Sequence, residues 1–179
     1  TVVSLPSSPV TDALRPSYQR ERQLVSEHLQ KPVPGSMDMP TRSGLRDALR
    51  DKKSTGHADG TGLILHFLGY EETRVSSGAA PRQARQQLWL SRDTGGDDWL
   101  EVEEAATLIN EGGSPELVCF SFCNSAPRLA ALTVAHGAHA AIGFQDTVTD
   151  EICESFFSLF YSCWRQKQWN LVQAFDAAL

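Results

Sequence analysis

Two short apolar segments constrain the fold of this chain more than any other feature of its sequence. They are GLILHFLG at 62–69 and ELVCFSFC at 116–123, each apolar at nearly every position. Such strands are covered on both faces, which is typical of the centre of a parallel sheet. Between them, EVEEAATLIN at 101–110 has helical periodicity and is followed by a glycine pair. The pattern predicts an α/β fold, with helices on both faces of a largely parallel sheet.

The rest of the chain continues this alternation of strands and helices. Further strands are expected at 2–5, at 138–144 and in a small hairpin that contains QLWLS at 87–91. Further helices are expected at 16–30, from Thr41 through TRSGLRDALRD, at 127–136, and in two closing segments, 149–166 and 170–179. Central position in the sheet is predicted for 62–69, because that strand is apolar on both faces.

Length and charge limit the classes of function. A chain of 179 residues that is 41% apolar buries one core, so we expect a single domain over 1–179. Because it begins without methionine, we interpret it as a domain excised from a longer protein. The net charge of −6 argues against nucleic acid as a partner. No apolar run approaches the ~18 residues of a membrane span, so no membrane partner is expected.

The four cysteines indicate a reducing compartment. Cys119, Cys123, Cys153 and Cys163 lie in apolar runs, and their spacings match no zinc-binding pattern. We interpret them as reduced thiols, which favours a cytoplasmic location. No metal and no cofactor is expected.

Cys123 is the residue with the clearest chemical potential. In open parallel sheets, functional groups collect where strands end and helices begin. Cys123 ends the segment 116–123 and precedes the helix expected at 127–136. The positive end of a helix favours the thiolate, which is the nucleophilic form of cysteine. The same position equally suits a small apolar residue that closes a strand.

Three segments, in this order, resemble a CHAT domain. They are LILHFLGY at 63–70, ELVCFSFCNSAP at 116–127, and the stretch from AHGAHAAIGF at 135–144 to the end of the chain. The resemblance implies a caspase-like cysteine peptidase fold, related to caspases and separase. It also implies a bacterial setting of defence or signalling, with fused sensor or repeat domains.

The same resemblance indicates a degenerate active site. Cys123 falls on the family's nucleophile. The family's strand usually ends with a histidine, three residues, then a second histidine and a glycine that supply the base and the oxyanion backbone. His66 matches the first histidine, but Tyr70 and Glu71 stand where the second histidine and its glycine are expected.

His66 and His57 are the candidates for a displaced base. His66 lies four residues before the strand end, roughly 13 Å back at ~3.3 Å per residue. In the family register it is level with Cys119 rather than Cys123, so a buried hydrogen bond between His66 and Cys119 is an alternative to catalysis. Tyr70 is expected to orient Cys123 without activating it, because a tyrosine is neutral at pH 7 and accepts protons poorly.

The resemblance also suggests residues that line a substrate groove. Gln145 and Asp150 match the turn that follows the third strand, and Asn124 is assigned to the groove as the neighbour of Cys123. Thr149 and Asp150 are equally explained as a helix N-cap and a first-turn charge, which is the interpretation that we prefer.

Three hypotheses about function remain open. The leading one is a pseudoprotease, a peptidase-type domain that has lost autonomous catalysis and serves as a recognition or regulatory module. The second is an active cysteine endopeptidase in which Cys123 attacks a peptide bond and His66 or His57 is the base. The third is a dimerisation domain that pairs through sheet edges. The expected partners are a protein or peptide and a second copy of the chain.

Overall fold

The fold is built on a four-stranded parallel sheet. A computed structural model describes residues 2–6, 15–29, 41–54, 62–68, 87–168 and 170–179. The strands are β1 (Val2–Pro6), β2 (Ile64–Leu68), β5 (Leu117–Ser121) and β6 (Ala141–Ile142), and their order in the sheet is β1-β2-β5-β6. All three pairings are parallel. The prediction of a largely parallel α/β fold is confirmed, and β2 and β5 occupy the centre as their apolar sequences predicted.

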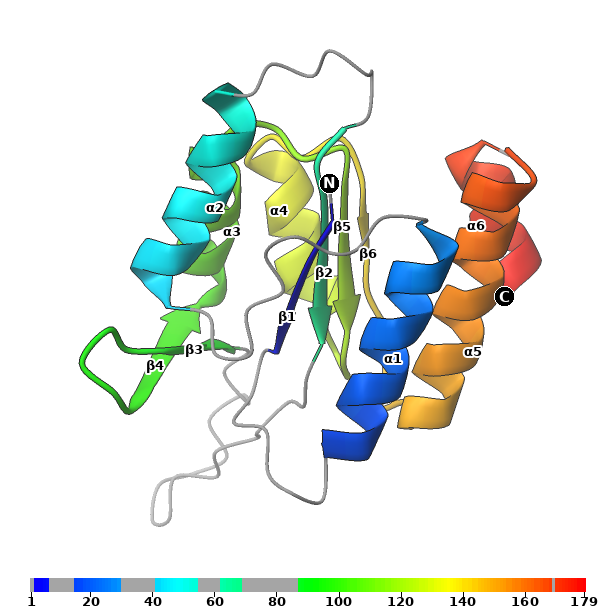
Figure 1. Ribbon diagram of the computed structural model, residues 1–179, viewed down its shortest axis with the longest axis horizontal. Coiled ribbons are helices and arrows are strands. Elements are labelled where there is room, and N and C mark those ends of the chain that lie inside the picture. The colour runs from blue at the N-terminus through cyan, green and yellow to red at the C-terminus, as the bar shows by residue number, and fades with distance from the viewer. Residues whose placement is uncertain (1, 7–14, 30–40, 55–61, 69–86, 169) are drawn as a thin grey trace.

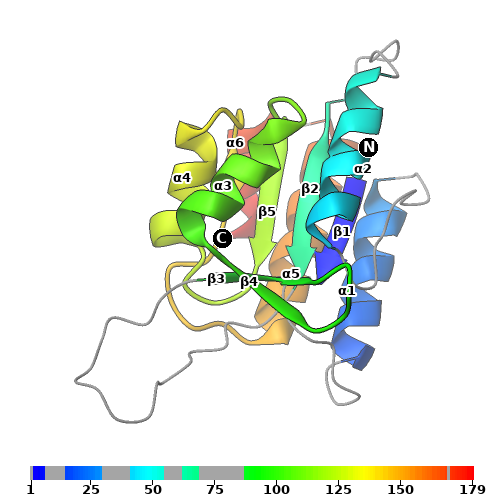
Figure 2. The same cartoon turned by 90° about the vertical axis from the view of Figure 1, so that its left-hand side faces the viewer.

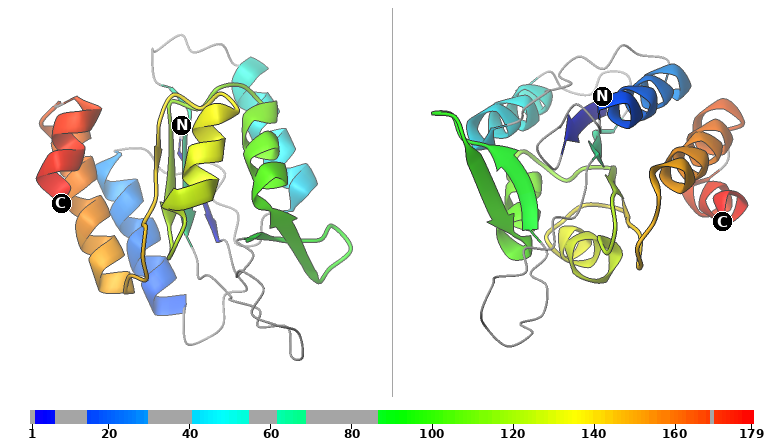
Figure 3. Two further views of the ribbon diagram at one scale, coloured as in Figure 1. Left: turned by 180° about the vertical axis from the view of Figure 1, so that it is seen from behind. Right: turned by 90° about the horizontal axis from the view of Figure 1, so that it is seen from below.

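Helices cover both faces of this sheet (Figures 1 and 3). One face carries α1 (Arg15–His28), α5 (Asp150–Tyr161), the π-helical turn η2 (Ser162–Gln166) and α6 (Leu171–Ala178). The other carries α2 (Arg42–Ser54), α3 (Val102–Glu111), the π-helical turn η1 (Ala126–Ala130) and α4 (Ala131–Ala135), which stand in front in Figure 2. None of the helices that the structure describes combines the length and the apolar character needed to cross a bilayer.

Alternate residues of the central strands supply the two halves of the core. Leu65 and Phe67 of β2 pack with the α2 and α3 side, whereas Ile64 belongs to the cluster formed with α1, α5 and α6. Because side chains alternate between faces along a strand, His66 points toward the second cluster, with Ile64. The imidazole is therefore embedded in a largely apolar layer, where it is fully buried.

An antiparallel hairpin connects β2 to the next part of the sheet. It consists of β3 (Gln87–Ser91) and β4 (Asp97–Glu101), and it leads directly into α3. The hairpin predicted around QLWLS is confirmed. Leu88, Leu90 and Leu100 are fully buried against the core shared with α2 and α3, so one face of the hairpin is part of the domain's interior.

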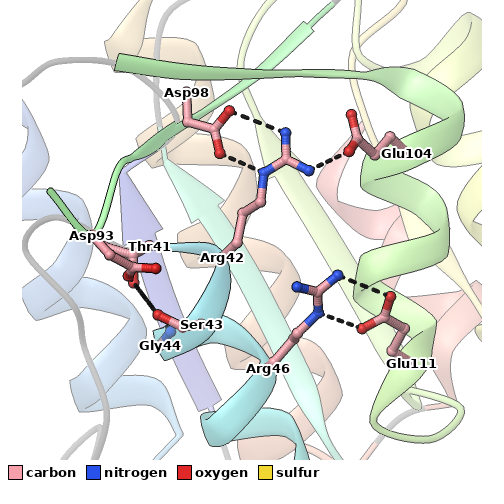
Figure 4. Close-up of polar contacts among 9 residues, drawn as sticks. All are labelled: Thr41, Arg42, Ser43, Gly44, Arg46, Asp93, Asp98, Glu104 and Glu111. Atoms are coloured by element: carbon pink, nitrogen blue, oxygen red, sulfur yellow. Dashed lines mark hydrogen bonds and ion pairs between the residues drawn. The ribbon is translucent and has the colours of Figure 1, made fainter. Parts of the chain in front are cut away.

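Ion pairs attach α2 to the hairpin and to α3 (Figure 4). The guanidinium of Arg42 binds both carboxylate oxygens of Asp98 in β4 and also contacts Glu104 in α3. One turn later, Arg46 binds Glu111 through two hydrogen bonds of 2.6 and 3.3 Å. The hydrogen bond to Asp98 raises the pKa of Arg42 above its ordinary value. A bidentate arginine–carboxylate pair fixes the relative orientation of its two partners, so the Arg42–Asp98 pair holds the hairpin in a defined orientation on α2.

Several elements differ from their predicted bounds by a few residues, and two of these differences lie next to Cys123. The helix expected at 127–136 begins one residue early with the turn η1 and continues as α4 to Ala135. The strand expected at 138–144 is reduced to the two residues of β6. After β6 the backbone bonds to the turn that follows β5 instead of extending the ladder, because Ala126 N donates to Phe144 O at 3.0 Å.

Candidate active site

Cys123 lies at the carboxyl edge of the sheet, in the turn between β5 and η1. In Figure 1 the arrowheads of β2 and β5 point to the edge at which α5 begins. Phe122 is buried and the Cys123 side chain is partly buried. Asn124 follows with a φ of 54°, a left-handed conformation that asparagine adopts more readily than most residues. The strand-to-helix position predicted for Cys123 is thus confirmed, although its catalytic role stays a prediction.

The hydrogen-bond partners of the Cys123 sulfur are backbone groups. Its Sγ accepts from Val148 N at 3.3 Å and donates to Val148 O at 3.5 Å. These two contacts hold the Cys123 side chain against the segment that leads into α5.

Ser125 anchors the turn that presents Cys123. The side chain is buried, its Oγ donates to Phe122 O at 2.8 Å, and Phe144 N donates to the same oxygen at 3.1 Å. The serine hydroxyl thus satisfies backbone groups from two segments and is a structural part of the site.

The three predicted substrate-binding residues lie on the same edge as Cys123. Asn124 N donates to Asp146 O at 3.3 Å, which places the turn beside the segment that carries Gln145. Gln145 is exposed, and Asp150 is the first residue of α5. Thr149 occupies the N-cap position of α5 without a side-chain hydrogen bond to the helix backbone. Contact with a substrate stays a prediction for all three.

His66 lies one strand away from Cys123 and has other partners. β2 and β5 pair so that His66 is level with Cys119, as the family register predicted. Its Nε2 lies 3.0 Å from Glu21 Oε1 of α1, and its Nδ1 lies 2.8 Å from the Tyr161 hydroxyl of α5. Both ring nitrogens are engaged, so in this arrangement neither is available to accept a proton from Cys123.

A hydroxyl bridges His66 and Cys119, for which a direct hydrogen bond was the alternative to catalysis. Tyr161 Oη donates to Cys119 Sγ at 3.3 Å. The same hydroxyl is hydrogen-bonded to His66 Nδ1, and His66 Nε2 continues the series to Glu21. The four side chains form a continuous buried chain across α1, β2, α5 and β5.

Burial determines the protonation of Cys119 and Tyr161 in this series of hydrogen-bonded side chains. It raises the pKa of Cys119 to about 12, and it raises the pKa of Tyr161 well above its ordinary value. Both groups are therefore neutral at pH 7. The His66 ring also packs edge-on against Phe157, with centroids 4.6 Å apart. These features indicate a structural network rather than a reactive one.

Two further histidines contact groups away from Cys123. His28 Nε2 lies 3.3 Å from Ser158 Oγ, and His136 Nδ1 lies 3.4 Å from Thr107 Oγ1. Across the part of the chain that the structure describes, no imidazole is hydrogen-bonded to the Cys123 sulfur. Tyr70, Glu71 and His57 lie outside the described residues.

Sequence analysis did not identify Glu21, Tyr161 or Val148 as part of this region. Glu21 did leave a signal: it lies four residues before Val25 and eight before Leu29, on the same apolar face of α1. A carboxylate on a buried helix face requires a partner. Val148 contributes only backbone groups, which no side-chain pattern reveals.

The fold and this edge define a class of protein: an α/β domain with a cysteine poised after a central parallel strand. Comparison with family models identifies the family, because the model described as CHAT domain matches residues 2–179. The chain belongs to the CHAT family, and it is a caspase-like, peptidase-type domain. Comparison with curated proteins found no match.

Proposed function

We propose that this domain is a pseudoprotease: a peptidase-type scaffold that has lost autonomous catalysis and acts as a recognition or regulatory module. The observation that carries the proposal is the position of His66. As the first histidine of the family motif it is present, but both of its nitrogens are bonded inside the core, to Glu21 and Tyr161. These bonds support a structural role for His66 rather than a catalytic one. Tyr70 stands at the position where the family has its second histidine.

The chemistry of cysteine peptidases explains why this substitution matters. A cysteine nucleophile is activated by an adjacent base that takes its proton. A phenol is a poor proton acceptor at neutral pH, so Tyr70 does not replace an imidazole. In the same motif Glu71 replaces a glycine whose backbone supplies the oxyanion site in the family. The base is therefore missing from the motif, and position 71 carries a carboxylate side chain where the family has a glycine.

The module's role follows from what the scaffold retains. The carboxyl edge still carries a partly buried Cys123, an exposed Gln145 and the start of α5, on which a peptide or protein segment can bind without being cleaved. We place this role in bacterial defence or signalling, in the cytoplasm, with a peptide, a protein or a second copy of the chain as the partner. The family membership and the reduced state of all four cysteines support this setting.

Labelling with peptide acyloxymethyl ketones tests the proposal. These probes need both an activated nucleophile and a peptide-binding edge. We expect the total labelling of the wild-type protein to be no greater than that of a Cys123→Ser control, which lacks the candidate nucleophile. In the double variant Tyr70→His/Glu71→Gly we expect labelling to appear, because the motif is then complete.

The alternative is an active endopeptidase with a displaced base. It predicts rapid labelling of wild-type Cys123 and loss of that labelling in His57→Ala or His66→Asn, and this outcome would refute lost catalysis. Silence in both the wild type and the double variant agrees with lost catalysis and shows that completing the motif at positions 70 and 71 does not by itself make Cys123 reactive. Sedimentation of the wild-type protein decides separately whether the domain dimerises.

A further inference from the structure

The segment between β6 and α5 is bonded along its length to the turn that carries Cys123. We call residues 144–148 the strap. Ala126 N donates to Phe144 O at 3.0 Å, and Asn124 N donates to Asp146 O at 3.3 Å. Val148 completes the series through its two bonds to the Cys123 sulfur. The strap and the turn thus run side by side, joined by backbone groups at alternate residues.

The contact with Val148 restricts access to the sulfur. Val148 N and Val148 O lie 3.3 and 3.5 Å from Cys123 Sγ, so the backbone of the strap lies directly against it. A reagent that approaches the sulfur from this side must first displace the strap. The strap therefore obstructs the approach to Cys123.

We propose that the strap is an autoinhibitory element, which must move away from Cys123 before the sulfur can react. The inference rests on Cys123 occupying the family's nucleophile position, and it holds whether or not a base is present. Binding of a partner that moves the strap away from Cys123 would expose the sulfur. Binding of a partner that leaves the strap in place would keep the sulfur covered. The strap precedes α5 directly, so displacement of α5 and opening of the strap are coupled.

Gly143, immediately before the strap, provides a way to open it. A Cβ added at this position would lie 2.8 Å from Ala126 N and 2.8 Å from Ser125 Oγ. Contacts this short require one segment to move. The residue at 143 is not in the left-handed region, so alanine is excluded by space and not by backbone conformation. Gly143→Ala is expected to push the strap away from the turn.

Iodoacetamide tests the strap, because this small electrophile requires neither a base nor a peptide groove. Alkylation of Cys123 is followed at pH 8 by mass spectrometry of peptides. In the wild type we expect Cys123 to react at least about tenfold more slowly than glutathione, and in Gly143→Ala we expect a rise of about tenfold or more. Thr147→Ala, which keeps every backbone bond of the strap, is the matched control and should stay within about twofold of the wild type.

The buried cysteines report whether a variant is folded. Cys119 and Cys153 should remain unlabelled throughout, since burial raises the pKa of each to about 12. If Gly143→Ala labels them as well, Val148→Pro replaces it, because proline removes the N–H that bonds to the sulfur. Wild-type alkylation as fast as that of glutathione, or an unchanged rate in a folded strap variant, would overturn the inference. A closed strap would also slow the peptide probes, so their labelling is compared in Gly143→Ala with and without Tyr70→His/Glu71→Gly. Labelling that appears only in the combined variant supports the pseudoprotease proposal, whereas labelling of Gly143→Ala alone would overturn that proposal and leave the strap inference standing.

Discussion

Removal of one hydroxyl tests the buried chain that engages His66. Tyr161→Phe deletes the hydroxyl that is hydrogen-bonded to His66 Nδ1 at 2.8 Å and to Cys119 Sγ at 3.3 Å. Tyr161 is fully buried, so no water replaces the oxygen and no large cavity is formed. The variant leaves a buried imidazole nitrogen without a partner. Such a group costs about 1–3 kcal/mol, whereas the weak bond to sulfur adds little.

Urea unfolding followed by tryptophan fluorescence measures this loss. We expect the free energy of unfolding to fall by about 1–3 kcal/mol, which corresponds to roughly 2–4 °C in Tm for each kcal/mol in a domain of this size. Ser158→Ala is the control, because it removes a hydroxyl that bonds to His28 in a partly exposed site. The control should change stability by less than about 0.5 kcal/mol.

A double-mutant cycle assigns the loss to His66. In a His66→Leu background the imidazole partner of the hydroxyl is gone, so Tyr161→Phe should cost about 1 kcal/mol less than in the wild type. Equal costs in both backgrounds, or a loss under about 0.3 kcal/mol in Tyr161→Phe alone, would show that the hydroxyl and the imidazole are not coupled. His66 would then be free to act elsewhere, and the structural explanation of its position would be wrong.

Two further predictions concern pH and surface charge. Folding raises the pKa of Cys119 from 9.0 to about 12, so the contribution of its neutral thiol to stability is complete below pH 9. That contribution is lost as the pH rises toward 12, by about 1.4 kcal/mol per pH unit. Cys119→Ala should therefore reduce the fall in the urea midpoint between pH 8 and pH 10, and an unchanged fall would contradict the burial argument. Arg42→Met should destabilise by about 1–2 kcal/mol because it breaks a partly buried bidentate pair with Asp98. Arg128→Met, at an exposed pair with Glu103, should cost under about 0.5 kcal/mol, and equal thermal shifts for the two arginines would refute this ranking.

The central part of the fold was predictable because its sequence is locally consistent. The consecutive apolar residues of β2 and β5 require cover on both faces, and the glycines after α3 end a helix that has one apolar face. The register of His66 with Cys119 followed from the family resemblance and was confirmed. In these elements, local pattern and tertiary packing favour the same structure.

Other features depend on pairings that sequence patterns do not encode. The apolar run at 138–144 predicted a longer strand, but the backbone after Ile142 bonds to the turn at 124–126, so the ladder ends. Likewise, the partners of Cys123 are backbone atoms of Val148, which any residue except proline would supply. The bridge from His66 to Cys119 through Tyr161 requires α5 to be docked on the sheet, which is a property of the assembled core.

The central claim is that, among the described residues, the Cys123 sulfur is partnered by backbone groups and by no imidazole. Alkylation of Cys123 by iodoacetamide in variants that each lack one histidine tests it most directly. We predict that replacing His28, His57, His136 or His139 by alanine leaves the rate within about twofold of the wild-type rate. A rate that falls about tenfold or more when one histidine is replaced would reveal an imidazole that activates the sulfur and would contradict the account.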